Sequence, residues 1–304
     1  MKKALFIGNS INQLGSTISW NQLLENIIQS IKKTNIISLE EKPYPLLYEE
    51  IYTRGKKYAK YDENKIRQEI IDATKQISVN TYHKQLMNLP FENILTTNYD
   101  YCLDIATNDS FLVFHKQEHK YNLFRRRETQ NQKKIFWHIH GEIDYKQSLT
   151  IGYEHYVGAI QKMRNYLTSG IDVQKQKTYR SPYIRKIMNF ETDIYSWIDI
   201  FLRDEIHIVG LGFDFHEIDL WWLLTYRNRL ILDKKIQCGK LFYYHFDKNN
   251  IDKKTEAKLA LLETLDVKIV KILSKSIDPK FDYESAWDNI LEKLKFAVEE
   301  ENES

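Results

Sequence analysis

The 304-residue sequence lacks the hallmarks of several large protein classes. It has 2 cysteines, Cys102 and Cys238, and no CxxC pair, which excludes a four-cysteine zinc site and indicates a reducing compartment. With only 10 glycines and 5 prolines, it has no flexible linker that would divide the chain. No apolar run approaches the roughly 20 residues of a membrane-spanning helix, and the run Ala4–Gly8 is too short for a signal peptide. We therefore expect a cytoplasmic protein with no membrane partner.

Three common site motifs are also missing. GxGxxG does not follow the first predicted strand, and neither GxxxxGK[ST] nor GxSxG occurs, so dehydrogenase, P-loop and serine-hydrolase chemistry have no motif support. The net charge of +2 predicts no acidic partner for the chain as a whole. Phe124–Arg127 with Lys133 and Lys134 forms a local basic cluster that can contact nucleic acid, but a solvated loop is the alternative. We expect nucleic acid as a partner only indirectly.

The sequence does contain ample material for a buried core. Apolar residues make up 42% of it, including 20 Tyr, 14 Phe and 6 Trp. Six short runs are rich in β-branched and aromatic residues: Ala4–Gly8, Asn93–Thr97, Lys134–His140, Ile206–Leu211, Leu241–Phe246 and Val267–Ile272. Most are almost continuously apolar, as in strands that are buried on both faces of a parallel sheet. They predict an α/β fold with a doubly wound, mostly parallel, Rossmann-like six-stranded sheet.

Segments with helical periodicity lie between these runs and after the last one. The clearest helical segments are Trp20–Ile31, Glu217–Leu230, Lys254–Leu265 and Ala286–Val298. Two longer stretches, at about 35–90 and 153–203, also look helical and exceed the length of a simple crossover. We therefore expect a single domain over residues 1–304 with helical insertions in these two places.

Small polar and titratable residues follow four of the predicted strands. Ligands of an open parallel sheet bind beyond the carboxyl ends of its strands, where these segments would meet. The segments are Gly8–Asn12, Thr96–Asp100, His140–Asp144 and Gly210–Asp214. A glycine at such a turn lets the backbone approach a phosphate. Four such segments at one edge of the sheet indicate a ligand site.

Each of these residues also has a structural interpretation. Gly8 can be an ordinary turn glycine, and Asn98 and Asp100 can cap a helix. His140 can be a packed, hydrogen-bonded histidine. His138 would point to the same side of a strand as His140, but the sequence shows no third ligand, so we expect no metal site.

In order and spacing, these segments resemble the sirtuin-like superfamily, in the form found in its bacterial branch. Thr96–Asp100 resembles the TQNID-type element, and His140–Asp144 resembles the histidine-glycine element. Gly8–Ser10, followed by Ser19-Trp20 and Leu23-Leu24, is similar to the opening glycine loop and first helix. Leu149–Tyr156 resembles a stretch that follows the histidine, and Ile208–Phe213 with Glu217–Asp219 resembles the late nucleotide-binding turn. The chain departs from the protein deacylases in its Asn9-Ser10 and in lacking their zinc module, so it looks like the bacterial sirtuin-like NAD hydrolases, many of which deplete NAD during phage infection.

The resemblance implies a set of site residues. Three of them would be catalytic. Asn98 would orient a water molecule and the ribose, and His140 would act as general base. Asp100 would bind the nicotinamide carboxamide or stabilise developing positive charge. Residues with an implied role in binding NAD are Gly8, Asn9, Ser10, Thr97, Gly210, Gly212, Phe213 and Asp219. NAD would be the substrate, with no metal.

Other functions stay open at this point. The chain can be an NAD or ADP-ribose sensor without turnover, a zinc-free deacylase or ADP-ribosyltransferase, or a structural subunit. An unrestrained NAD hydrolase would kill its host, so control is expected from homo-oligomerisation or from a separate regulatory partner, such as a HerA-type ATPase.

Overall fold

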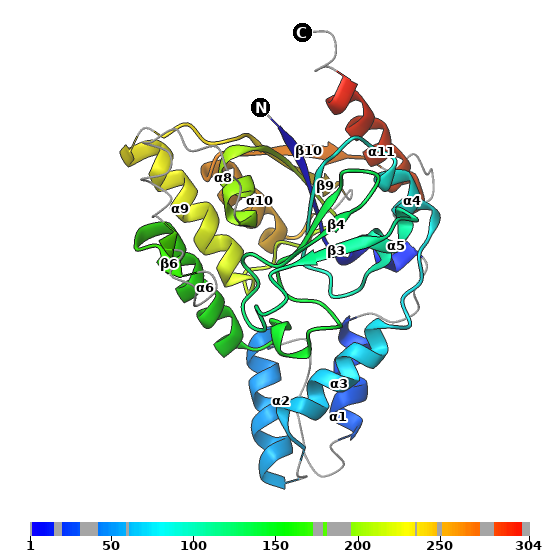
Figure 1. Ribbon diagram of the computed structural model, residues 1–304, viewed down its shortest axis with the longest axis vertical. Helices are drawn as coiled ribbons and strands as arrows, with labels where there is room; N and C mark the ends of the chain where they lie inside the picture. Colours follow the sequence, from blue (N-terminus) through cyan, green and yellow to red (C-terminus); the bar gives the residue numbers. More distant parts are fainter. Residues whose placement is uncertain are drawn as a thin grey trace.

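The computed structural model describes residues 2–14, 20–30, 42–58, 61–172, 179–180, 196–234, 236–247, 251–273 and 283–299 (Figure 1). Ser19, the end of the predicted helix at Ile31 and parts of both predicted insertions lie outside the described residues, as do the side chains of Trp20 and Leu23.

The described residues form one mixed, mostly parallel sheet of eight strands, in the order β10-β9-β8-β1-β2-β5-β4-β3. Six of these strands coincide with the predicted runs: β1 (Lys3–Ile7), β2 (Asn93–Thr96), β5 (Ile135–His138), β8 (Glu205–Val209), β9 (Leu241–Phe246) and β10 (Val267–Ile272). All pairings among these six are parallel. The α/β class and the mostly parallel sheet are therefore confirmed, but the prediction of six strands is wrong.

The two further strands form an antiparallel hairpin at one edge. β3 (Phe111–Phe114) pairs with β4 (Arg126–Thr129), which in turn pairs antiparallel with β5. Each has four residues, and β4 carries Arg126, Arg127 and Glu128. Because antiparallel strands can face solvent on one side, such a charged segment lacks the pattern of a strand buried on both faces. A separate two-stranded ladder joins β6 (Ile171–Asp172) and β7 (Tyr179–Arg180).

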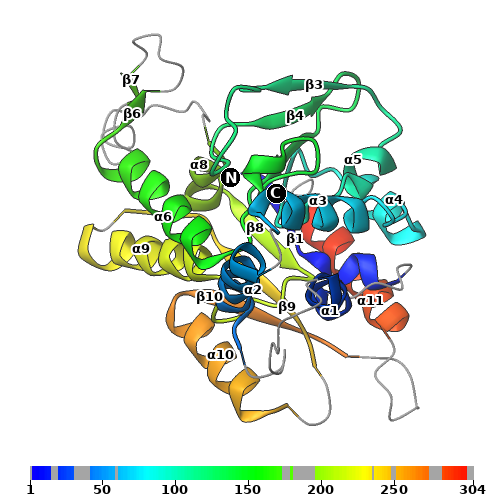
Figure 2. The same ribbon diagram turned by 90° about the horizontal axis from the view of Figure 1, so that it is seen from below.

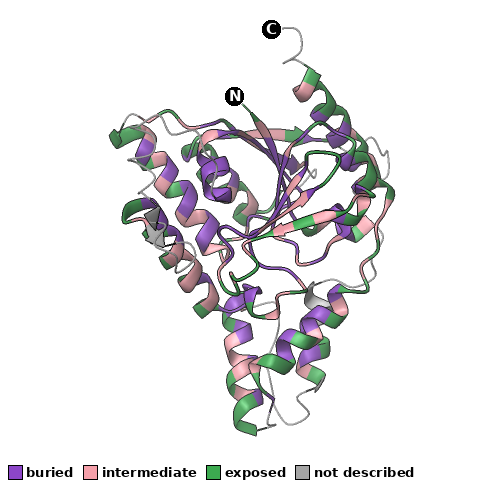
Figure 3. Ribbon diagram, viewed as in Figure 1, coloured by how far each residue is buried: buried purple, intermediate pink, exposed green. Residues whose placement is uncertain are grey.

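Helices cover both faces of the sheet. The alternating side chains of β1 show why: Ala4 and Phe6 enter one core, and Leu5 and Ile7 enter the other. The first core is closed by α6 (Tyr153–Thr168), α8 (Trp197–Arg203), α9 (Ile218–Lys234) and α10 (Lys253–Thr264). The second is closed by α4 (Thr81–Met87), α5 (Cys102–Ala106) and α11 (Tyr283–Glu299). The strands between them are largely buried (Figure 3).

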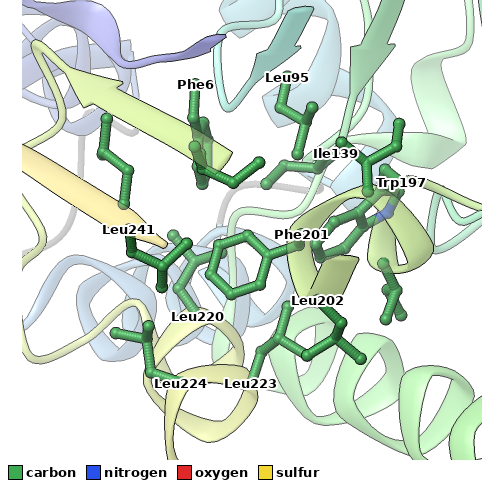
Figure 4. Packing of buried hydrophobic residues seen from close by; sticks show 14 of the residues in the cluster. Phe6, Leu95, Ile139, Trp197, Phe201, Leu202, Leu220, Leu223, Leu224 and Leu241 are labelled. Atoms are coloured by element: carbon green, nitrogen blue, oxygen red, sulfur yellow. The ribbon is translucent and has the colours of Figure 1, made fainter. Parts of the chain in front are cut away.

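Phe201 of α8 lies at the centre of the first core (Figure 4). It is fully buried and meets Phe6 of β1 edge-to-face, with 6.4 Å between the ring centroids. Truncating a phenylalanine buried in this way costs about 3–5 kcal/mol, so this contact holds α8 firmly against the sheet. Since β8 follows directly after α8, the packing also fixes where β8 begins.

A group of helices between β1 and β2 projects from the carboxyl ends of the strands. It contains η1 (Asn9–Leu14), α1 (Trp20–Ser30), α2 (Tyr44–Tyr58) and α3 (Glu63–Thr74). Helices α1, α2 and α3 lie side by side below the sheet (Figures 1 and 2). They share a third core that includes Leu24, Ile51 and Ile66, and that core also takes in Leu149 and Ile151 from the loop after β5. Helices α2, α3 and α4 therefore lie within the first predicted insertion, and the third core packs α2 and α3 against the loop after β5 at the rim of the sheet.

Polar caps set several helix starts. Asp62 accepts a hydrogen bond from the backbone N–H of Lys65 at the start of α3, and Asp252 accepts one from Thr255 at the start of α10. Asn80 forms a capping box with His83 at the start of α4. Among the described helices, none is both long and apolar enough to cross a membrane.

Candidate active site

A cavity of about 580 Å³ opens at the carboxyl ends of the parallel strands. This volume lies within the usual range for small-molecule sites, about 300–1,000 Å³. Its walls include residues that follow β1, β2, β5 and β8, and residues at the end of β9. The cavity spans the switch point of the sheet, because the chain leaves β1 toward β2 and β5 and returns on the other side at β8.

The structure brings most of the predicted site residues to this cavity. Those that line it are Asn9, Ser10, Thr97, Asn98, Asp100, His140, Gly210 and Gly212. Gly8, Phe213 and Asp219 lie behind the wall. Phe213 is fully buried and packs edge-to-face on Trp221, with ring centroids 5.2 Å apart.

Two glycines allow β1 and β8 to approach closely at the switch point. A Cβ on Gly8 would lie 2.4 Å from Leu211 Cα, so a side chain there would push the strands apart. Gly210 has a φ of +67°, and a Cβ would lie 2.6 Å from the Ser10 hydroxyl. Gly212 is different, because the nearest atom to its Cβ position is 3.7 Å away on Asp214. The first two glycines are therefore required by the backbone, whereas Gly212 tolerates a side chain.

Asn98 lines the cavity and is 6% exposed. Its backbone N–H donates to Thr96 Oγ1 at 3.0 Å, and its Nδ2 lies 3.4 Å from the carbonyl oxygen of Gly8. Its Oδ1 is buried and has no hydrogen-bond partner among the described residues. A buried acceptor without a partner is costly, and a ligand with a donor can satisfy it. The side chain does not cap a helix.

Asp100 is held by hydrogen bonds from two sides. Its Oδ2 accepts from Asn12 Nδ2 at 2.8 Å, and its Oδ1 accepts from the backbone N–H of Cys102 at 2.9 Å. The second bond satisfies a free donor in the first turn of α5, as the capping interpretation predicts. Asn12 Oδ1 in turn lies 3.1 Å from His83 Nε2. Burial lowers the pKa of His83 to about 4 despite the nearby Asp100 carboxylate, so His83 is neutral and donates through Nε2.

His140 is paired with a buried carboxylate. Its Nε2 lies 2.9 Å from Asp219 Oδ2, and the two side chains are 5% and 3% exposed. Burial by itself lowers the pKa of His140, but the Asp219 carboxylate outweighs it and the net direction is upward. Within the described residues, Nδ1 has no hydrogen-bond partner, and His140 lines the cavity. With Nε2–H donated to Asp219, neutral His140 presents the lone pair of Nδ1 as a base.

The loop that carries His140 is clamped by the helices between β1 and β2. The His140 carbonyl accepts from the backbone N–H of Thr150 at 2.7 Å. Arg67 of α3 is buried and donates through Nη1 to the carbonyl oxygens of Lys146 and Leu149, at 2.9 and 2.8 Å. Tyr44 of α2 and residues at the end of α3 complete the cavity wall on this side. The helical insertion therefore closes one side of the site and holds the histidine loop in place.

These placements can be compared with known families. Residues 92–222 match the family model of a SIR2-like domain. Such a domain implies NAD binding and suggests an NAD-using enzyme. The match contains Asn98, Asp100, His140 and Asp219, whereas the turn after β1 and the strands β9 and β10 lie outside it. No curated protein matches the chain significantly.

A second carboxylate of the SIR2-like domain, that of Glu217, faces His140 and is not among the predicted site residues. Glu217 lines the cavity, and its Oε2 accepts from the backbone N–H of Asp214 at 2.9 Å. Burial raises the pKa of Glu217 to about 7, and the neighbouring carboxylates of Asp219 and Asp214 add to this while His140 opposes it. The position of Glu217 shortly after the glycines that follow β8 was the sequence signal that could have identified it as a site residue. A carboxyl group that titrates near neutral pH can donate or accept a proton there.

Three residues of the basic cluster, Arg125, Arg127 and Lys134, are bound to partners within the fold. Arg125 is fully buried and pairs with Glu142, and Arg127 donates to Asp104 Oδ1 at 2.8 Å. Lys134 is buried as well, and its ammonium group donates to two backbone carbonyls. The nucleic-acid and solvated-loop interpretations therefore both fail for these three residues, because their charged groups are bound to partners within the fold.

His138 and His140 do not point to the same side. β5 ends at His138, so His140 lies in the following turn and the alternation of a strand no longer relates them. His138 faces Asp104 and His140 faces Asp219. In the part of the chain that the structure describes, no three His, Cys, Asp or Glu side chains are grouped to hold a metal ion.

Proposed function

We propose that this protein is an NAD glycohydrolase, which converts NAD and water into nicotinamide, ADP-ribose and a proton. One observation carries the proposal: Asn98, whose amide oxygen has no partner among the residues that the structure describes, and His140, backed by Asp219, line one cavity at the switch point of the sheet. A SIR2-like domain over residues 92–222 supports NAD as the ligand. The cavity can take a ligand of dinucleotide class.

The proposed reaction needs a water molecule and a base. The bond between the ribose C1′ and the nicotinamide nitrogen breaks, and its electron pair leaves with neutral nicotinamide, so no acid is needed for the leaving group. The ribosyl centre becomes oxocarbenium-like and is attacked by water, as in other glycosyl transfers. Asn98 orients the water through its amide, and His140 Nδ1 takes the proton. Asp219 holds the imidazole and stabilises the imidazolium that forms.

The remaining rim residues are proposed to position the rest of the substrate. Asp100 accepts from the nicotinamide carboxamide or stabilises the developing positive charge. The turn after β1, with Ser10, and the glycines Gly210 and Gly212 approach the phosphates and the adenosine ribose. Ser10 lines the cavity, and its buried hydroxyl has no hydrogen-bond partner among the described residues.

Such an activity requires control, since NAD loss is lethal to the cell that contains the enzyme. We propose, as suggested by the resemblance to defence NAD hydrolases, that the protein depletes NAD during phage infection. Homo-oligomerisation or a separate regulatory partner such as a HerA-type ATPase would supply the control. If the isolated monomer hydrolyses NAD at full rate, this part of the proposal is wrong.

The catalytic assignment is tested by nicotinamide release from NAD with Asn98→Ala and His140→Ala. Each should lower turnover by about 10²–10⁴-fold while the fold is retained. Asn93→Ala is a matched control, because Asn93 is a buried asparagine at the other end of β2, where it accepts from Trp137 Nε1 at 3.2 Å. It should retain turnover. Unchanged turnover in both site variants would refute the assignment.

A further inference from the structure

His138 is buried directly behind the proposed catalytic asparagine. Its side chain is 1% exposed, and it is not among the residues that line the cavity. The Nδ1 atom lies 2.9 Å from the backbone carbonyl oxygen of Asn98, and Nε2 lies 3.1 Å from Asp104 Oδ2. No step of the proposed reaction uses this histidine, so its burial between two polar groups needs another explanation.

The two partners determine the protonation state of His138. A backbone carbonyl oxygen can only accept a hydrogen bond, and Asp104 is also an acceptor here, because its other oxygen accepts from Arg127 at 2.8 Å. A neutral imidazole has one N–H and can satisfy only one of the two. The imidazolium ion has an N–H on each nitrogen and satisfies both. The geometry therefore selects the charged form.

The charges around His138 agree with this assignment. The groups that face it are Asp104 of α5 and Glu142 after β5, and each carboxylate is itself paired with an arginine, Arg127 or Arg125. Tyr101 meets the ring edge-to-face, with centroids 5.4 Å apart. Burial by itself lowers the pKa of His138, but Asp104 first and then Glu142 and the Asn98 carbonyl raise it, to about 9.

The hydrogen bond from His138 completes the positioning of Asn98. The backbone N–H of Asn98 is fixed by Thr96 Oγ1 at 3.0 Å, and its carbonyl is fixed by His138. Both ends of the residue are thereby held at the cavity wall, and its Oδ1 has no partner in the described part of the chain. Asp104 is fully buried in α5, so the hydrogen bonds from His138 to Asp104 and to the Asn98 carbonyl, here called the clamp, also tie that helix to the turn that carries Asn98.

We infer that His138, as an imidazolium ion held by Asp104, is a positioning residue that fixes the backbone of Asn98 and so orients its amide in the cavity. For its effect on turnover the inference rests on the proposed NAD glycohydrolase function. Its structural part, a charged histidine bound to the Asn98 carbonyl, holds independently of that function.

The first test is an NMR titration of the unmodified full-length protein. The ¹⁵N signals of the His138 ring should show both nitrogens protonated at neutral pH and lose a proton near pH 9. The ¹³C signal of the Asn98 carbonyl should titrate together with them. A neutral His138 at neutral pH, or an Asn98 carbonyl that ignores its titration, overturns the inference, whether or not the protein cleaves NAD.

The second test is kinetic and uses Asp104→Asn and His138→Gln. Displacement of a catalytic group costs up to about 10²-fold, so kcat for NAD should fall by about 10- to 100-fold with little change in KM. In Asp104→Asn the loss of activity at high pH should also begin at lower pH, because His138 loses its proton more easily. A general structural defect would not change the pH at which activity is lost on the alkaline side. An unchanged alkaline pH dependence together with an unchanged kcat therefore contradicts the inference.

His207→Gln is the matched control for His138→Gln. His207 is also a buried strand histidine, which lies 2.9 Å from the Tyr244 hydroxyl and 3.2 Å from a Glu205 oxygen, and it does not line the cavity. It should leave kcat and its pH profile as they are. If no variant and no wild-type protein turns over NAD, the proposed function fails, and the NMR titration alone decides on the clamp.

Discussion

The pairing of His140 with Asp219 makes Asp219→Asn an informative substitution. Asparagine has nearly the same shape as aspartate, so the variant removes a buried negative charge 2.9 Å from His140 Nε2 and little else. Burial and the Asp219 carboxylate act in opposite directions on the pKa of His140. Without the carboxylate, burial dominates, and the pKa falls. The asparagine Nδ2 can also donate to Nε2, which places the proton on Nδ1 and removes the lone pair that the reaction needs.

The expected loss follows from the hydrogen bond. A hydrogen bond to a charged group contributes about 1.5–3 kcal/mol. If all of it stabilises the imidazolium in the transition state, kcat falls by about 10- to 150-fold, at 1.36 kcal/mol for each factor of ten. The pH profile should change as well. In the wild type the basic form of His140 appears as pH rises through its raised pKa, so the acid limb of kcat should lie above the ordinary histidine value; in the variant it should move to lower pH.

The assay is nicotinamide release measured across the acid limb for the wild type, Asp219→Asn and a control. Asp199→Asn is a suitable control, because Asp199 is another buried aspartate, bonded to the Tyr166 hydroxyl at 2.7 Å and outside the cavity wall. It should lower stability but leave the pH profile of kcat in place. An Asp219→Asn enzyme with wild-type kcat and an unmoved acid limb would refute the role of His140 as base.

Three further predictions concern the framework. Gly210→Ala should destabilise the protein by at least about 1 kcal/mol in urea unfolding, because Gly210 has a φ of +67° and its Cβ would lie 2.6 Å from Ser10 Oγ; Gly212→Ala, with open space, should cost less. Glu142→Gln should cost about 3–5 kcal/mol by leaving Arg125 buried without its charge partner, and a loss below about 1 kcal/mol would show that the pair is not desolvated. His83 should destabilise the fold in acid, because its pKa of about 4 in the folded protein lies below the unfolded value of about 6.5. Its contribution to stability is present above pH 6.5, and roughly 3 kcal/mol is lost as the pH falls toward 4. His83→Gln should flatten this part of the plot of unfolding free energy against pH.

The central strands and the rim of the site were predictable because they depend on local patterns. Continuously apolar runs such as Leu241–Phe246 identify buried parallel strands, and the carboxyl ends of such strands must meet at one edge. This logic places Asn98 and His140 at the same edge from the sequence alone. It requires no knowledge of which strand lies beside which.

What the sequence could not reveal depends on contacts between distant segments. The strand Arg126–Thr129 is charged, and nothing local shows that Arg127 neutralises Asp104 of a different element. β5 ends at His138, two residues earlier than predicted. His140 therefore lies in the following turn, and His138 and His140 face different partners. The pairing of His140 with Asp219 joins residues that are 79 positions apart, so only the fold identifies Asp219 as a partner of the base.

The helices that close the site also depend on contacts between distant segments. Their periodicity predicts that they are helices, but not that Tyr44 of α2 would line the cavity or that Arg67 of α3 would bind the histidine loop. A buried arginine on a helix has the same sequence pattern as an exposed one. The role of Arg67 becomes visible only in the fold, where it donates to the carbonyl oxygens of Lys146 and Leu149.

The most direct measurement is the product balance of the purified protein incubated with NAD alone, followed by liquid chromatography and mass spectrometry. We predict that nicotinamide and ADP-ribose appear in equal amounts, without any acylated peptide or acceptor protein, and that His140→Ala slows the formation of both by about 10²–10⁴-fold. Intact NAD under all conditions, including the oligomeric form and the presence of a regulatory partner, would contradict it. Nicotinamide released only when an acyl-lysine or acceptor substrate is added would contradict it equally.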